Sequence, residues 1–398
     1  MTDADPQGAF RIGSAGSTNV TCESAADHAV DLCMDRMRGS SPDCVMIFAT
    51  EQHAAWFGSM CERVMQRTGA KRSLGVISPG ILSGRGAVES GHAVTVFALK
   101  GVEHHLSATE IAPFEPRVRI LFAEQESESL PGLFEGRSET CPVIGTVVPA
   151  LKSKRPTIFV DAAPSQESAC AISLRGHFSF DAVVSHGCVA CGPNLVITRA
   201  AEDRVLELGG RPAAEVIREQ IQSLPEGIRR HATEGVFLGR LMNAYSNVQG
   251  RADYLLRRVS RIDAAEGAVY ASERFRVGQT VRIHVRDPIT ASNDLAMLLD
   301  AQRFKGHAEG ALLFCSSGRG EAMYGVSAHE LHVISRALAP AEAGEELAKA
   351  GRRLDPTSRA RLPISGVFGA SEIGPIGTMG AAHALLSQTS VLGVFRRG

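Results

Sequence analysis

Apolar residues recur at helical spacing in several stretches of the chain. Residues 23–38 place Ala26, Val30, Cys33 and Met37 on one side of a helix. The same spacing predicts further helices at residues 53–69, 212–224, 292–304 and 327–338.

The helix predicted at residues 53–69 has the clearest pattern. Trp56, Met60 and Val64 fall on one face, which we expect to be buried, and Gly69 stands where a helix ends in the left-handed conformation. Short apolar runs predict buried strands between the helices. They cover residues 44–50, 73–78, 92–99, 117–124, 157–163, 170–177, 181–187, 253–263, 267–273, 280–287, 311–317, 363–377 and 388–395. The fold class is therefore mixed α/β (α+β), with mixed β-sheets flanked by helices.

The chain divides into two consecutive regions in this interpretation, residues 10–225 and 226–398. The stretch 224–235 ends a helix with proline, glycine and charged residues, and this composition is typical of a boundary. The stretch 340–361 is rich in charge, and we expect it to be mobile.

The two regions share a faint pattern that would make them distantly related. Gly75-Val76 is followed after a glycine-rich interval by His92-Ala93, and Gly366-Val367 is followed in the same way by His383-Ala384. Because glycine and alanine are common residues, relatedness and coincidence both remain open.

Composition restricts the partners that the protein can have. The 398 residues are 44% hydrophobic and 21% charged, and 42 Lys and Arg residues nearly balance 43 Asp and Glu residues. With no excess of positive charge, we expect neither nucleic acid nor an anionic membrane as a partner. No run approaches the roughly 18 apolar residues of a membrane helix.

The N-terminus and the cysteines predict a cytoplasmic protein. The first residues are polar and acidic, unlike the basic start and apolar stretch of a signal peptide. The nine cysteines are odd in number and scattered, which favours reduced thiols over a disulfide framework.

The stretch 185–200 carries the most conspicuous candidate chemistry. Cys188 and Cys191 form a Cys-x-x-Cys pair, but Gly192 and Pro193 follow them, whereas a redox pair opens a helix. A structural zinc site would need a second pair, so we interpret the stretch as a loop at a strand boundary. His186 could ligate a metal or haem iron at a strand end, and a structural histidine is the alternative.

Other familiar motifs fail on spacing. His329-Glu-Leu-His332 has its histidines three residues apart, whereas zinc proteases need four, so we interpret it as a solvated helix face. Ser327 and Glu330 have the spacing of a capping box at the start of that helix. Met323 stands where a dinucleotide-binding motif needs glycine, and Ile373 stands where a hydrolase elbow needs glycine.

Polar residues next to glycines at strand ends form the remaining candidate site. Cys315 lies near Arg319, Arg286 precedes Asp287, and Glu372 precedes a Gly-Pro pair. Glycine lets a backbone approach a ligand closely, and an Arg fork can bind a carboxylate. The sequence therefore predicts a pocket for a small polar molecule, unless these charged residues pair with one another to fix loops.

At these same residues the sequence resembles the FIST family of signalling proteins. The similarity is carried by several motifs in a fixed order, from about residue 25 to residue 396, as a FIST-N region followed by a FIST-C region. The motifs are HGCVACGPNLVIT, VLELGGRPAAEVI, DYLLRRVSRIDAAEGAVYASERFRVGQTVRIHVRD, GALLFCSSGRGEAMYG, PISGVFGASEIGPIG and AHALLSQTSVLGVF.

The resemblance implies a sensory domain for a small ligand, proposed to be an amino acid or a similar metabolite, with no established catalysis. It also implies an alternative, because some bacterial members are described as haem-containing nitric-oxide sensors that act with histidine kinases. The family loop usually reads Gly-Cys-Arg-Pro-Ile-Gly-Pro. Here Cys188 matches, Val189 and Ala190 replace Arg-Pro, and Ser371 replaces the usual glycine before Glu372.

Three functional hypotheses follow. The first is a cytoplasmic sensor that binds a metabolite and signals through a separate partner, such as a histidine kinase, with no cofactor. The second is a haem-based nitric-oxide sensor with His186 as the iron ligand. The third is an enzyme with Cys315 as nucleophile and a histidine such as His383 as its base. For the first, the expected ligand-binding residues are Cys188, Arg286, Asp287, Cys315, Arg319 and Glu372.

Overall fold

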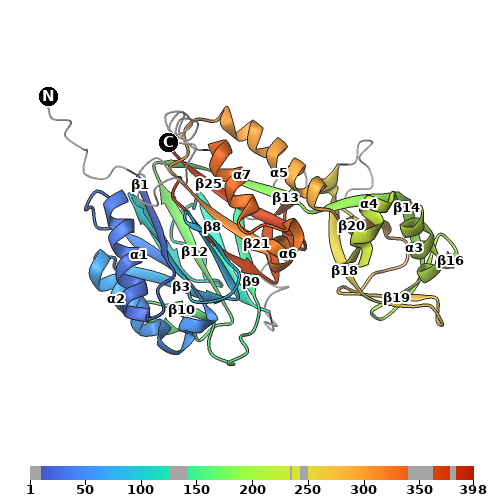
Figure 1. Cartoon of the computed structure of the whole chain (residues 1–398), viewed down its shortest axis with the longest axis horizontal. Helices are drawn as coiled ribbons and strands as arrows, with labels where there is room; N and C mark the ends of the chain where they lie inside the picture. Colours follow the sequence, from blue (N-terminus) through green and yellow to red (C-terminus); the bar gives the residue numbers. More distant parts are fainter. Residues whose placement is uncertain (1–9, 126–140, 234, 243–249, 339–361, 377–381) are drawn as a thin grey trace.

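The computed structural model describes residues 10–125, 141–233, 235–242, 250–338, 362–376 and 382–398. Its strands form three six-stranded sheets and one seven-stranded sheet, with helices against the sheets (Figure 1). The mixed α+β class is thus confirmed. No helix in the described part is long and apolar enough to cross a membrane.

The first sheet contains one parallel pair of strands, β2 and β3, and is otherwise antiparallel. In sheet order, its strands are β1 (Arg11–Ser17), β6 (Val94–Lys100), β2 (Cys44–Thr50), β3 (Arg72–Ser78), β10 (Ile158–Val160) and β11 (Ala163–Pro164). One face is covered by α1 (Cys22–Arg36) and α2 (Phe57–Thr68), and the short η1 (Glu51–Trp56) precedes α2.

The second and third sheets repeat this layout. The second consists of β7 (Val102–Leu106), β12 (Ala169–Gly176), β8 (Val118–Glu124), β9 (Val143–Val148), β23 (Ser371–Ile376) and β24 (Ala382–Leu386). The third consists of β13 (Phe178–His186), β25 (Thr389–Arg397), β21 (Gly310–Ser316), β22 (Ile364–Gly369), β4 (Gly80–Ser83) and β5 (Gly86–Val88). In each, the third and fourth strands are parallel and the other pairs are antiparallel.

The first four strands of each sheet define a unit: unit 1 (β1, β6, β2, β3), unit 2 (β7, β12, β8, β9) and unit 3 (β13, β25, β21, β22). Each unit gives its hairpin to another unit. The hairpin β4–β5 leaves unit 1 and pairs with β22, β23–β24 leaves unit 3 and pairs with β9, and β10–β11 leaves unit 2 and pairs with β3. The exchange is cyclic, so every sheet is completed by a neighbour and the units are interlocked with approximate threefold symmetry.

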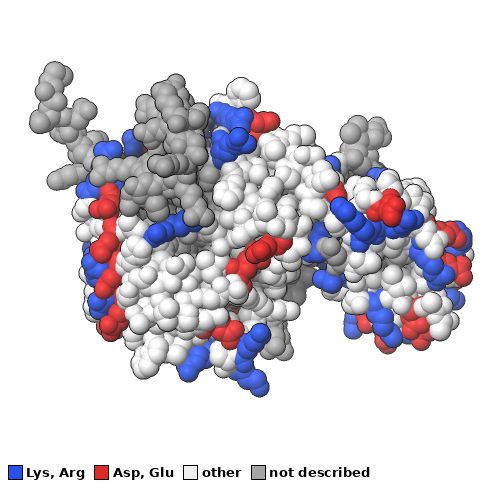
Figure 2. All heavy atoms as spheres, in the orientation of Figure 1, with Lys and Arg blue, Asp and Glu red and all other residues white. Residues whose placement is uncertain are grey.

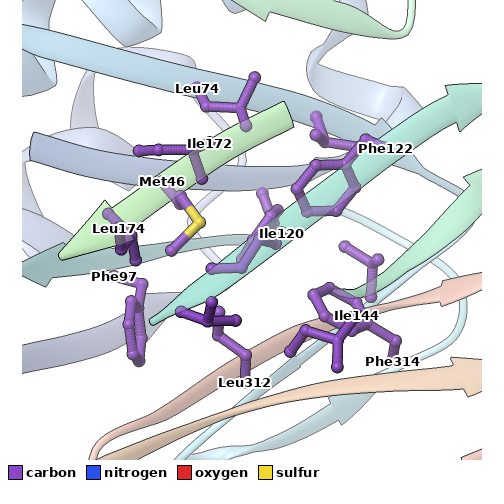
Figure 3. Packing of buried hydrophobic residues seen from close by; sticks show 14 of the residues in the cluster. Met46, Leu74, Phe97, Ile120, Phe122, Ile144, Ile172, Leu174, Leu312 and Phe314 are labelled. Carbon is purple, nitrogen blue, oxygen red and sulfur yellow. The ribbon is translucent and has the colours of Figure 1, made fainter. Parts of the chain in front are cut away.

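The three units meet in one hydrophobic core. Phe48, Phe122 and Phe314 occupy the same position on β2, β8 and β21. The ring centroid of Phe122 lies 5.7 Å from that of Phe48 and 5.5 Å from that of Phe314. Apolar residues of all three units surround them, as Figure 3 shows for the strands that carry Met46 and Leu312.

Unit 3 also has helices and an inserted lobe. The helices are η5 (Ser317–Arg319), α6 (Glu321–Tyr324), α7 (His329–Leu338) and α5 (Pro288–Arg303). The lobe spans residues 188–286 between β13 and α5 and projects to the right in Figure 1. It consists of β14 (Cys188–Ala201), β20 (Thr280–Arg286), β17 (Val236–Leu241), β18 (Tyr254–Asp263), β19 (Ala268–Ala271), β15 (Arg204–Leu208), β16 (Arg211–Pro212), α3 (Ala213–Gln222), α4 (Glu226–Arg229), η3 (Arg230–Thr233) and η4 (Arg251–Asp253).

Most predicted elements are confirmed, including the left-handed end of α2 at Gly69, whose φ is 74°. Three local interpretations are wrong. Trp56 is 68% exposed because residues 51–56 form a 3-10 turn that shifts it off the face of Met60. The Cys-x-x-Cys stretch is strand β14, not a loop. The predicted capping box is not formed among the described residues, because the side chain of Glu330 points to the buried Arg319.

The faint internal pattern is half explained by the units. Gly75 and Gly366 lie at the same position of β3 and β22, so that part of the pattern reflects related units. His92 precedes β6 whereas His383 lies within β24, so the second part is coincidence. The symmetry is threefold, and strands from both predicted regions share sheets. The predicted boundary between two regions at residues 225/226 therefore stays a prediction. The stretch 340–361, predicted to be mobile, lies outside the described residues.

The close contact at Gly366 yields a stability prediction. A Cβ atom there would lie 1.7 Å from the carbonyl oxygen of Leu313 on the parallel strand. Because that neighbour is backbone, we expect Gly366→Ala to lower the free energy of unfolding by about 3 kcal/mol in urea unfolding. Gly227→Ala, where a Cβ meets nothing within 4 Å, is the control. Equal stability of the two variants would contradict the unit geometry.

Candidate functional site

The predicted site residues gather at one edge of the third sheet, which we call the junction site. Strands β13 and β21 are both antiparallel to β25, so both end at this edge. Ligands of open α/β sheets bind outside the carboxyl ends of such strands. The lobe is connected here as well, because Asp287 donates its backbone N–H to the carbonyl of Gly187 at 3.1 Å, and these residues flank the lobe.

Arg319 lies at the centre of the junction site and its side chain is 0% exposed. Its Nε donates to Glu330 Oε1 at 2.7 Å, and its Nη1 donates to the carbonyl of Gln388 at 3.2 Å. A Cβ at Gly187 would lie 2.6 Å from that Nη1 atom, so glycine is needed for the guanidinium to fit. The arginine thus fixes the ends of three strands.

The carboxylate of Glu330 accepts hydrogen bonds at both of its oxygen atoms. Oε1 accepts from the Tyr324 hydroxyl at 2.6 Å, and Oε2 accepts from the Ser390 hydroxyl and from the Cys315 thiol, the latter at 3.2 Å. Burial raises the pKa of Glu330, but the charge of Arg319 and these hydrogen bonds outweigh it, so the pKa lies below its ordinary value. The pair is therefore ionised and fully satisfied.

Cys315 does not have the surroundings of a nucleophile. Burial, and then the charge of Glu330, raise the pKa of its thiol well above the ordinary value. Its contacts are a carboxylate and the hydroxyl of Ser390 at 3.3 Å, whereas His383 accepts from the backbone N–H of Val143 at 3.0 Å. The geometry therefore disfavours an enzyme that uses Cys315 and His383.

Glu372 is the unusual acid of the junction site. It is 0% exposed, and its Oε2 accepts from the hydroxyl and backbone N–H of Thr389 at 2.8 Å and 3.3 Å. Burial raises its pKa to about 8, although Thr389, Arg319 and Ser316 act in the opposite direction. Glu372 is consequently protonated at neutral pH, and its Oε1 has no hydrogen-bond partner within the described part.

His186 and Gln388 carry two more buried atoms without a hydrogen-bond partner among the described residues, Nδ1 and Oε1 respectively. The backbone N–H of His186 donates to Asp294 Oδ2 at 2.8 Å, and Asp294 also pairs with Arg251 at 2.9 Å. Burial lowers the pKa of His186 to about 4, so the ring is neutral. His186 is only 7% exposed, so a haem could reach its ring only if neighbouring residues moved, and the described arrangement does not fit that cofactor.

The remaining predicted residues line the connection to the lobe. Arg286 Nη1 donates to the carbonyl of Gly318 at 2.9 Å, and Asp287 caps α5 by accepting from the Thr290 N–H at 2.7 Å. Cys188 lies opposite Arg286 in the sheet, and burial raises its pKa to about 12. Arg319 pairs with Glu330, which is not one of the predicted residues.

Sequence reasoning missed Glu330, Tyr324, Ser390 and Gln388. The sequence predicts a solvated helix face for the His329–His332 motif, but Glu330 is 4% exposed, and only His332 of that motif is exposed. The polar run Gln388-Thr389-Ser390, which leads into the apolar stretch 391–395 of β25, was the available signal. Within the described part, no group of three or more His, Cys, Asp and Glu residues is placed to hold a metal.

A cavity of about 390 Å³ lies elsewhere in the described part. It is lined by Arg11, Ile12, Asp35, Arg36, Arg38, His307, Ala308, Glu309, Leu362, Pro363 and Arg397. None of the junction-site residues lines it. Its basic residues lie beside Asp35 and Glu309, and Arg397 already pairs with Glu309 at 2.8 Å.

Comparison with known proteins gives the family. The FIST N domain model matches residues 43–211 and the FIST C domain model matches residues 213–375. The chain belongs to the FIST family. FIST domains are sensory domains of signal transduction. An uncharacterized protein of Mycobacterium bovis is 25% identical over 413 residues, covering 96% of this chain and 98% of the relative. One of Mycobacterium tuberculosis is 26% identical over 402 residues, covering 96% and 99%.

The raised pKa of Glu372 yields a pH prediction. The folded protein holds a proton that the unfolded chain, with an ordinary pKa of 4.5, releases. The contribution of Glu372 to stability should therefore fall as pH rises between those two values, by up to about 1.4 kcal/mol per pH unit. Glu372→Gln removes this contribution, so between about pH 5 and pH 8 its free energy of unfolding in urea should decline less, or rise more, with pH than that of the parent. The exposed-site variant Glu226→Gln should keep the parental slope, and equal slopes for all three proteins would contradict the assignment.

Proposed function

We propose that this FIST protein is a sensor that binds a small polar metabolite, an amino acid or a relative of one, at the junction site. The observation that carries the proposal is a set of three buried polar atoms that have no hydrogen-bond partner among the described residues: Glu372 Oε1, Gln388 Oε1 and His186 Nδ1. Buried polar groups are normally hydrogen-bonded, and exceptions mark functional positions. A ligand with several donors would satisfy them.

The chemistry of the junction site suits a zwitterion. The guanidinium of Arg286 is held at the strand ends by its bond to the Gly318 carbonyl, where it can attract a ligand carboxylate. Glu372 is neutral before binding, and a ligand ammonium group beside it would favour its ionised form. Binding would then release a proton, so affinity should rise as pH approaches 8.

The route of the signal follows from the position of the site. Both chain crossings to the lobe, at Gly187 and Asp287, are joined by one hydrogen bond at the junction site. Because the site is closely packed, entry of a ligand requires the strand-end loops to part, and this changes how the lobe is held. We propose that a separate protein, such as a histidine kinase, reads that change.

We propose that the protein is soluble and works inside the cell. Figure 2 shows positive and negative side chains interspersed over the lobe and the edge of the molecule, without a large patch of one sign on this face. All nine cysteines are described and none is in a disulfide, which supports a reducing compartment such as the cytoplasm.

Thermal unfolding with a panel of amino acids and related metabolites tests the proposal. A ligand at 100 times its dissociation constant stabilises the folded state by about 2.7 kcal/mol. Glu372→Gln and Arg286→Gln should each weaken binding at least about tenfold, because each removes a charged contact. Arg282→Gln is the matched control, since Arg282 lies four residues before Arg286 on β20 and donates to the carbonyl of Gly192 in the lobe. Binding that survives both site variants would overturn the proposal.

We do not carry the haem alternative forward, because the packing around His186 does not fit the cofactor. Protein expressed with haem available should therefore be colourless in its visible absorption spectrum. A Soret band that moves with nitric oxide and disappears in His186→Ala would contradict this.

A further inference from the structure

Unit 1 carries a polar cluster at the place where unit 3 carries the junction site. His53 follows the end of β2 by three residues, and Arg319 follows the end of the equivalent strand β21 by three residues. His92 lies four residues before the residue of β6 that pairs with Ile47, and Gln388 has the same place before β25. In both units the two residues are in contact. The ring centroids of His53 and His92 lie 5.2 Å apart, and Arg319 donates to the carbonyl of Gln388 at 3.2 Å.

The cluster differs from the junction site in its chemistry. Cys22 is the first residue of α1, and its Sγ lies 3.2 Å from Nδ1 of His53. His53 is 0% exposed, and its Nε2 has no hydrogen-bond partner among the described residues. A thiol at a helix start in contact with a buried imidazole is the arrangement in which a cysteine is activated by a base.

Protonation states suit a base that acts during the reaction. Burial, and then the neighbouring His92, lower the pKa of His53 to about 4, so its ring is neutral and can accept a proton. Partial burial raises the pKa of the Cys22 thiol, so the thiol is protonated at rest. Attack by sulfur therefore requires the proton to be removed, and His53 is in hydrogen-bond reach of it.

Exposure singles out the same residue. Of the nine cysteines, eight are buried and only Cys22 is partly exposed. A reagent in solution can therefore reach one thiol of the folded protein. With no second accessible thiol, an oxidised Cys22 cannot close a disulfide within the native fold and remains available to a small thiol.

We propose that Cys22 is a modification site, at which His53 acts as base while a hydroperoxide oxidises the thiol to a sulfenic acid. The sulfur attacks one peroxide oxygen, the O–O bond breaks, and the thiol proton passes to His53 Nδ1 and on to the leaving oxygen. The thiol and hydroperoxide thus give a sulfenic acid and an alcohol, or water when the oxidant is hydrogen peroxide. The protein then has an oxidative input that does not depend on the junction site.

Hydrogen peroxide followed by dimedone tests the proposal on the full chain. Mass spectrometry of the native protein should find one dimedone adduct, on Cys22, that is lost in Cys22→Ser. His53→Gln should slow the reaction at least about tenfold, as expected for loss of a general base. The control His28→Gln changes a nearby histidine that contacts Ser17 and Arg85, and it should react at the parental rate.

Free imidazole distinguishes a base from a merely structural histidine. It should restore the rate of His53→Ala but leave the parental rate unchanged. Thermal unfolding verifies that the variants fold, and His53→Gln keeps the test valid if His53→Ala does not. An unmodified native protein, an adduct on a buried cysteine, or an unchanged rate in His53→Gln would each overturn the proposal.

Discussion

Cyclic exchange of hairpins is the constraint on which the rest of the structure depends. Each unit alone would leave a strand edge open on its parallel pair, and such edges invite aggregation. The hairpin of a neighbouring unit closes each edge, and the phenylalanines of β2, β8 and β21 fill the space where the units meet. Because no sheet is complete without another unit, the units must fold together, and the ends of the equivalent strands acquire fixed positions.

Those fixed strand ends explain why a charged pair can be buried at the junction site. Removing Arg319 and Glu330 from water costs several kcal/mol per ion, and only close geometry and additional donors compensate for this. Here the donors come from β21, β25 and α6, three elements whose positions the sheet determines. The saturated ion pair is a rigid support, whereas Glu372, Gln388 and His186 each keep an atom that no described residue satisfies. We infer that the Arg319–Glu330 pair holds the strand ends in position, and that the other three residues bind the ligand.

Short-range patterns predicted much of this fold, and long-range ones did not. Buried strands such as β2 and β21 are continuous apolar runs, so their positions in the chain could be predicted from the sequence. The hairpin exchange was not, because pairing partners such as β4 and β22 are nearly three hundred residues apart. The threefold symmetry was missed for a related reason: unit 2 has no helix between β7 and β8, so its residues do not repeat the pattern of unit 1.

The candidate site was predicted in the same partial way. Glycines and charges at strand ends pointed to the correct edge, because close approach and ligand chemistry are local properties. The partner of Arg319 could not be predicted, since Glu330 sits in a helix whose sequence has the spacing of an ordinary cap. The contact of Cys22 with His53 could not be predicted either, because it joins two helices, α1 and η1, whose contacting residues lie about thirty positions apart in the sequence.

A ligand at the junction site should change how the lobe is held. Hydrogen–deuterium exchange, measured with and without the metabolite that gives the largest thermal shift, would detect this change at individual amides. We expect changed exchange at the amides of Gly187, Asp287 and Thr389, with the core strand β8 unaffected. A ligand that protects the residues around Arg11 and Arg397, and leaves the amides of the junction site unchanged, would contradict it.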